Sequence, residues 1–110
     1  DLRFPTMYRK LAQAGAKIIF IPSAFTRTTG RDHWLTLVKA RAIENGCFIV
    51  APAQCGQHYK GRETFGHSVI ISPWGKIIKI KKSGIGIITA ELSLKEVEIS
   101  RKSIPSLKIN

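Results

Sequence analysis

Apolar residues along the chain occur in short runs, separated by polar stretches that contain glycine or proline. In the first run, over residues 6–14, Met7 and Leu11 are spaced i, i+4, so they would lie one above the other on a helix. Thr6 is a residue type that caps helix N-termini, and Gly15 stands where a left-handed glycine commonly ends a helix. The pattern predicts a first helix with Thr6 as its N-cap.

A strand, a helix and a second strand follow. The β-branched run over residues 17–21 is typical of a strand buried on both faces. Asp32 can cap a second helix that Gly46 ends, and residues 47–52 form another short apolar run. The spacing along that helix places on one face Trp34, Leu37, Val38 and Ala42. Two strands joined through a helix are usually parallel, so we expect a βαβ unit.

The second half of the chain has a different pattern. Residues 66–72 and 77–82 flank the turn sequence PWGK and predict an antiparallel hairpin. Residues 84–92 predict one more strand. Ser93 and Glu96 have the spacing of a capping box, which predicts a final helix after them. Together the segments predict an α/β protein with a mixed sheet, a parallel βαβ unit and a C-terminal β-hairpin.

The composition is that of a packed domain. At 110 residues, of which 44% are hydrophobic, the chain is one domain or part of one, and the hydrophobic content argues against disorder. No apolar run approaches the roughly 18 residues that a membrane span needs, so we expect no membrane partner.

The net charge of +11 raises nucleic-acid binding as an alternative function. The basic residues are spread along the chain, however, and their densest cluster has no interleaved aromatic side chains for base stacking. That cluster consists of Lys76, Lys79, Lys81 and Lys82. A solvated basic surface is the interpretation that we prefer.

The spacing of the two cysteines does not suggest a disulfide framework, so we expect a reducing, cytoplasmic location. Cys47 begins a predicted buried strand and is expected in the core. Cys55 and His58 are the only local cysteine–histidine arrangement, and they lack a third group that would orient the histidine. No known ligand spacing for zinc relates Cys55, His33, His58 and His67.

Ligands of parallel α/β sheets bind beyond the carboxyl ends of the strands. Here those ends lead into residues 22–30 and 52–58, and residues 1–5 are expected on the same rim. Arg41 and Glu44, spaced i, i+3, are either a general base with a tuning cation or an ion pair that positions the helix, and we favour the ion pair. Spacing alone therefore indicates a pocket rim without a complete catalytic site.

Several motifs in order give the sequence a family resemblance. They are DLRFP, PSAFTRTTGRDHW, ARAIENGCFIVAPAQCG, GRETFGHSVIISPWG and RKSIP. Together they resemble the carbon–nitrogen hydrolase (nitrilase) superfamily, in particular its branch of ω-amidases and deaminated-glutathione amidases. The resemblance implies an αββα sandwich, no metal or organic cofactor, and amide hydrolysis by a Glu–Lys–Cys triad. In that chemistry the cysteine attacks the carbonyl, donors stabilise the oxyanion, and water releases the acid from a thioester.

The resemblance also implies that the catalytic triad lies outside these residues. The family's nucleophile stands in a C-x-D-L-R-F-P context, and Asp1 matches the aspartate, so the cysteine is expected two residues before Asp1. The glutamate and lysine are expected farther upstream. Cys47 and Cys55 match other positions and do not inherit the role of nucleophile.

Part of the substrate pocket is implied to remain. The position of Arg3 contacts a substrate carboxylate in related amidases, and those of Phe25 and Thr29 line the same pocket. Alternative roles stay open: Arg3 as an ion-pair residue, Phe25 as core and Thr29 as a turn residue. The motif that contains Arg41 and Glu44 is implied to be structural, like Asp1 near the site.

We therefore expect residues 1–110 to be the C-terminal part of a single carbon–nitrogen hydrolase domain, with no complete domain boundary inside the chain. The expected ligand is a small-molecule amide, and the chain alone is expected to be inactive. The expected protein partner is a second copy or a complementing N-terminal half. A split or degenerate fragment that acts by association is the alternative, and nucleic-acid binding is the least supported reading.

Overall fold

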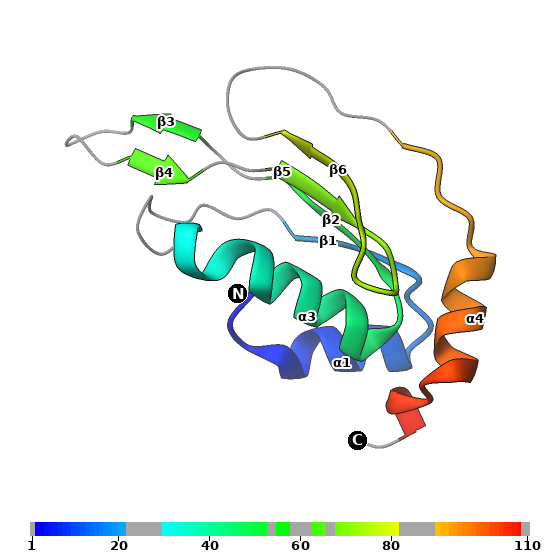
Figure 1. Ribbon diagram of the computed structural model, residues 1–110. Coiled ribbons are helices and arrows are strands. Elements are labelled where there is room, and N and C mark those ends of the chain that lie inside the picture. The colour runs from blue at the N-terminus through cyan, green and yellow to red at the C-terminus, as the bar shows by residue number, and fades with distance from the viewer. Residues whose placement is uncertain are drawn as a thin grey trace.

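A four-stranded mixed sheet forms the centre of the fold (Figure 1). The computed structural model describes residues 2–21, 30–52, 55–57, 63–65, 68–81 and 90–108. The strands, in their order across the sheet, are β1 (Ile18–Phe20), β2 (Phe48–Ala51), β5 (Ser68–Ile71) and β6 (Ile77–Lys81). β1 and β2 are parallel, whereas the pairs β2–β5 and β5–β6 are antiparallel. The predicted mixed sheet, parallel pair and hairpin are confirmed.

The first helix, α1 (Pro5–Gln13), begins two residues earlier than a helix capped by Thr6 would. Its N-cap is Phe4, in an extended conformation, so the prediction of Thr6 as the cap is wrong. Pro5 explains the difference, because a proline at the first helical position has a suitable φ and needs no hydrogen-bond partner for its nitrogen. Gly15 follows the helix at φ +109°, which confirms the predicted stop.

The buried side of α1 carries Tyr8 and Ala12. Met7 and Leu11 share a face, as their spacing requires, but that face is exposed. Phe20 in β1 is also 68% exposed, so the prediction of a strand buried on both faces is wrong at this residue. β1 is the outermost strand of the described sheet, and Phe20 lies on the face of β1 opposite to the buried Ile19.

A π-helical turn, η1 (Gly30–Trp34), leads directly into α3 (Leu35–Asn45). Asp32 lies inside this turn, and no side chain caps α3, so the predicted role of Asp32 as N-cap is wrong. The wide turn extends the helical path backwards past the expected boundary. Gly46 ends α3 in the left-handed conformation, at φ +59°, as predicted.

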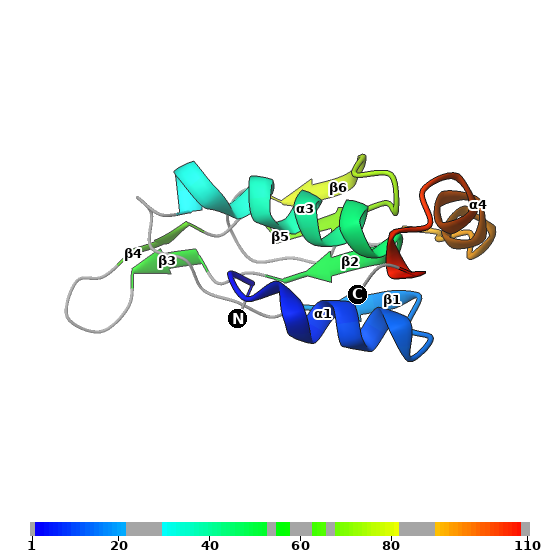
Figure 2. The same cartoon turned by 90° about the horizontal axis from the view of Figure 1, so that it is seen from below.

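The hydrophobic core lies between the sheet and its two covering helices, α1 and α3 (Figure 2). Ile19 of β1 pairs in register with Ile49 of β2, which pairs with Ile71 of β5, so three isoleucines form one row across the sheet. The predicted helix face packs onto them, with Trp34, Val38 and Ala42 buried and Leu37 partly buried.

The turn between β5 and β6 is closed by a side chain. The hydroxyl Oγ of Ser72 accepts hydrogen bonds from the backbone N–H groups of Trp74 (3.3 Å) and Lys76 (3.1 Å). Gly75 occupies a left-handed position at φ +89°. A register shift follows between Ile70 and Ile71, where the ladder with β6 becomes irregular.

Two further elements depart from prediction. The strands β3 (Cys55–Gln57) and β4 (Glu63–Phe65) form a separate antiparallel ribbon that the sequence did not indicate. Of the strand expected over 84–92, residues 84–89 lie outside the described part of the chain, and residues 90–92 are not in a strand.

The last helix, α4 (Lys95–Ser103), forms where predicted, but without the capping box. Its N-cap is Leu94, and the backbone carbonyl of Ser93, not the hydroxyl, accepts from the Glu96 N–H at 3.0 Å. A short 3₁₀ turn, η3 (Ser106–Lys108), follows. None of the described helices has the length and apolar character needed to cross a bilayer.

Candidate functional site

The start of α1 meets the π-helical turn η1 through one polar contact. The Nη1 atom of Arg3 lies 3.1 Å from Nδ1 of His33, and both side chains are exposed. Leu2, directly before the arginine, is 1% exposed and anchors this end of the chain in the core. Arg3 is therefore an exposed residue whose preceding neighbour, Leu2, is fixed in the hydrophobic core.

Arg41 of α3 provides the anchor for that backbone. Its Nε atom donates to the carbonyl oxygen of Leu2 at 2.9 Å, and its Nη1 atom forms an ion pair with Glu44 Oε1 at 2.9 Å. The ion pair that the i, i+3 spacing predicted is present, and Arg41 as a residue is only 6% exposed. Because one buried cation bridges α3 and the segment before α1, it positions the residue that follows Leu2.

Burial changes the acidity of two groups near this anchor. Loss of solvent raises the pKa of the Cys47 thiol to about 11, an effect that Arg101 opposes and Glu44 reinforces. Cys47 is fully buried, so at neutral pH it is an uncharged core thiol, as predicted, and cannot act as a nucleophile. Burial also raises the pKa of Tyr8, although the positive charge of Arg41 acts in the opposite direction.

The other residues predicted for the site lie outside the described part of the chain. These are Asp1, Phe25 and Thr29. His58 and His67 are also outside it. Of the three predicted substrate-binding residues, the structure thus describes only Arg3.

The sequence reasoning missed His33 as a partner of Arg3. From the sequence, His33 was a candidate only for metal binding. Its contact with Arg3 was not predictable from a local pattern, because the two residues are 30 positions apart. One signal was available: His33 lies three residues after the segment 22–30, which was expected on the same rim as residues 1–5.

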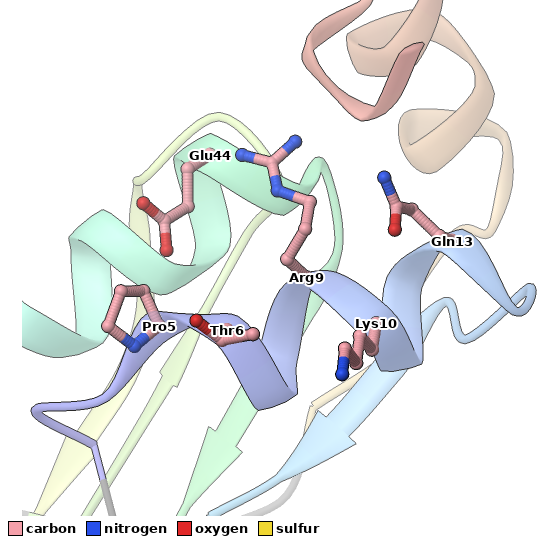
Figure 3. Close-up of a pocket in the computed structure, with 6 residues that line it drawn as sticks. All are labelled: Pro5, Thr6, Arg9, Lys10, Gln13 and Glu44. Atoms are coloured by element: carbon pink, nitrogen blue, oxygen red, sulfur yellow. The ribbon is translucent and has the colours of Figure 1, made fainter. Parts of the chain in front are cut away.

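A groove of about 410 Å³ runs along α1 and reaches α3 at Glu44 (Figure 3). Its walls are Pro5, Thr6, Arg9, Lys10, Gln13 and Glu44. At one end Arg9 Nη1 donates to the Ser106 carbonyl at 2.6 Å, and Gln13 Nε2 donates to the Leu107 carbonyl at 3.0 Å. These bonds attach the C-terminal turn η3 to α1, so this groove lies where secondary-structure elements pack together. Arg3 is not among the residues that line it.

These features define an α/β protein in which Arg3, just before the first helix, follows a backbone segment that is hydrogen-bonded to α3. The chain belongs to the carbon-nitrogen hydrolase family, whose match covers residues 1–102. This confirms the resemblance seen in the motifs to the nitrilase superfamily of amidases and related hydrolases.

Similar proteins carry amidase names. A deaminated glutathione amidase from Synechocystis is 47% identical over 108 residues, which are 98% of this chain and 40% of that protein. The human deaminated glutathione amidase is 44% identical over 105 residues, 96% of this chain and 32% of that protein. The crystal structure of the C. elegans NitFhit protein superposes with a TM-score of 0.93 at 39% identity, covering 100% of this chain and 27% of that one. The chain therefore spans 40% or less of the length of each of these three proteins.

Proposed function

We propose that the chain is the C-terminal part of an amidase that hydrolyses the carbon–nitrogen bond of small, carboxylate-bearing amides. Membership of the carbon-nitrogen hydrolase family and the amidase names of its relatives support the reaction class. The observation that carries the substrate class is Arg3, an exposed residue directly after the buried Leu2, whose backbone carbonyl accepts a hydrogen bond from Arg41.

Arg3 is chemically suited to hold a carboxylate. The planar fork of a guanidinium can donate two parallel hydrogen bonds to the two oxygens, which fixes the orientation of the substrate as well as its position. In this proposal Phe25 and Thr29 line the same pocket. Arg41 and Glu44 take no part in the chemistry and hold the backbone at Leu2.

The proposed reaction proceeds through a thioester on a cysteine that precedes Asp1. The cysteine thiol gives its proton to the catalytic glutamate, and the thiolate adds to the amide carbonyl. Collapse of the tetrahedral intermediate breaks the carbon–nitrogen bond, and the glutamate passes the proton to the leaving nitrogen, which departs as ammonia. The glutamate then removes a proton from water, which attacks the thioester and releases the acid and the thiol. None of these three groups is in the 110 residues, so the chain alone is proposed to be inactive.

The test compares the 110-residue chain with the gene product that contains it at full natural length. Succinamate, a short amide with a distal carboxylate, is the substrate, and ammonia release is measured. We expect hydrolysis by the natural-length product, none by the 110 residues, and loss of the preference over butyramide in Arg3→Ala. Thiol-dependent turnover by the short chain that disappears in Cys55→Ala contradicts the proposal.

A second candidate function, association with a complementing part of the domain, is supported by an exposed apolar edge. Phe4, the N-cap of α1, is 67% exposed, Met7 and Leu11 on α1 are 50% and 43% exposed, and Phe20 on β1 is 68% exposed. Figure 2 shows α1 and β1 on the same side of the layer. Within the described residues β1 pairs only with β2, so its other edge can accept a further strand.

The proposed occupant of this edge is the N-terminal part of the same hydrolase domain, because the matched relatives are more than twice as long as this chain. The isolated chain is expected to self-associate in light scattering. Met7→Lys combined with Phe20→Lys should shift it toward the monomer, whereas Thr6→Lys, on the exposed groove side of α1, should not. A monodisperse, folded wild-type monomer contradicts the association.

A further inference from the structure

The contact between Arg3 and His33 has a defined direction. A guanidinium carries only N–H donors, so Nδ1 of His33, 3.1 Å from Nη1 of Arg3, has to be the acceptor. The neutral imidazole then carries its single proton on Nε2. The geometry thus assigns both the direction of the hydrogen bond and the tautomer of the ring.

We infer that His33 is a positioning residue that holds the Arg3 guanidinium in the orientation that binds the substrate carboxylate. The inference rests on the proposed function and adds to it a residue that acts on substrate affinity through Arg3. It assigns His33 no contact with the reacting atoms.

The two ends of the arginine are restrained from different elements. On the backbone side, the carbonyl of Leu2 accepts from Arg41 of α3. On the side-chain side, the guanidinium donates to His33 of η1. A free arginine side chain loses rotamer entropy when it is ordered. Restraint before binding removes part of that cost from the binding step, which strengthens affinity without any added contact.

His33 is well placed to act as the fixed partner. The next residue, Trp34, is 1% exposed and belongs to the hydrophobic core. η1 continues without a break into α3, which also carries Arg41. The acceptor for the guanidinium and the anchor for the backbone therefore belong to one continuous helical element, so their spacing is maintained together.

The test measures the affinity of the natural-length gene product for succinate, which has the same distal carboxylate as succinamate and is not hydrolysed. Calorimetry on His33→Ala is expected to show binding about tenfold weaker, as for loss of one charge-assisted hydrogen bond. His33→Asn keeps an oxygen acceptor near the position of Nδ1 and should bind within about twofold of wild type. In an Arg3→Ala background, His33→Ala should have no further effect.

Turnover separates this inference from the proposed function. With succinamate, His33→Ala should raise KM and leave kcat unchanged, whereas with butyramide neither should change. If neither amide is hydrolysed but the succinate effects of Arg3 and His33 remain coupled, the proposed amidase fails and the role of His33 stands. Wild-type affinity in His33→Ala, an equal loss for butyramide, additive effects in the double variant, or no succinate binding by the wild type each overturn the inference.

Discussion

The Nη2 atom of Arg101 lies 2.6 Å from the carbonyl oxygen of Ala16, a residue 85 positions earlier in the chain. The same guanidinium approaches the carbonyl of Asn45 through Nε, at 3.4 Å. One side chain of α4 thus connects the turn after α1 with the C-terminal end of α3. The C-terminal helix is attached to the α/β layer by a partly buried cation that satisfies two backbone carbonyls.

Removal of this cation should weaken the attachment of α4. We expect Arg101→Ala to lower the free energy of unfolding by about 1–3 kcal/mol, because two carbonyls lose a charged donor. Urea unfolding followed by the fluorescence of the buried Trp34 measures the loss. Lys102→Ala, at an exposed neighbouring position, is the matched control and should stay within about 0.5 kcal/mol of wild type. Equal effects of the two substitutions contradict the role of Arg101.

Gly46 should resist substitution for two separate reasons. Its φ of +59° disfavours any residue with a side chain, and an added Cβ would lie 2.9 Å from Cγ of Arg101. We expect Gly46→Ala to cost about 1–2 kcal/mol of unfolding free energy. Gly15→Ala is the control for the backbone alone, since Gly15 also has a positive φ and nothing lies within 4 Å of a Cβ added there.

The clash and the backbone strain at Gly46 can be separated by a double variant. Arg101→Ala removes the atom that the new Cβ would meet, so Gly46→Ala should cost less in that background than in the wild type. If the losses of unfolding free energy from Gly46→Ala and Arg101→Ala simply add, the predicted clash does not occur, because the side chain of Arg101 then moves aside at no cost.

Ser72 should be replaceable by aspartate but not by alanine. Its Oγ accepts two backbone N–H groups in the turn, and Ser72→Ala leaves both without that acceptor. We expect a loss of about 1 kcal/mol for alanine, whereas Ser72→Asp retains an acceptor and should remain close to wild type. Denaturant midpoints of the two variants at neutral pH make the comparison. A loss with aspartate as large as with alanine contradicts the importance of the acceptor.

Cys47 should make the fold sensitive to alkaline pH. Because burial raises its pKa from 9.0 to about 11, the folded state holds the thiol proton more tightly than the unfolded state does. The resulting stabilisation is present below pH 9 and is lost as the pH rises toward 11, by an amount on the order of 2 kcal/mol. Stability measured from pH 8 to 11 should fall more steeply in wild type than in Cys47→Ala. Parallel curves contradict the assignment.

Backbone conformations with a local cause were predictable from the sequence. Gly15 and Gly46 were assigned as helix ends, and both adopt positive φ, because few residues other than glycine do so without strain. The hairpin turn before β6 followed from PWG, and the parallel pair β1–β2 followed from the order strand, helix, strand. The starts of helices were less predictable, because Pro5 and the wide turn η1 moved them from the expected caps.

Of the candidate site, the sequence determined the residue types, the helix ends and the order of strands that the family motifs share. Only the tertiary structure decided that α1 buries Tyr8 and Ala12 while Phe20 stays exposed, and that His33 meets Arg3. The physical reason is the distance along the chain over which each effect acts. Periodicity and glycine conformation act within a few residues. A buried face, or a hydrogen bond between residues 30 positions apart, exists only once other elements have packed.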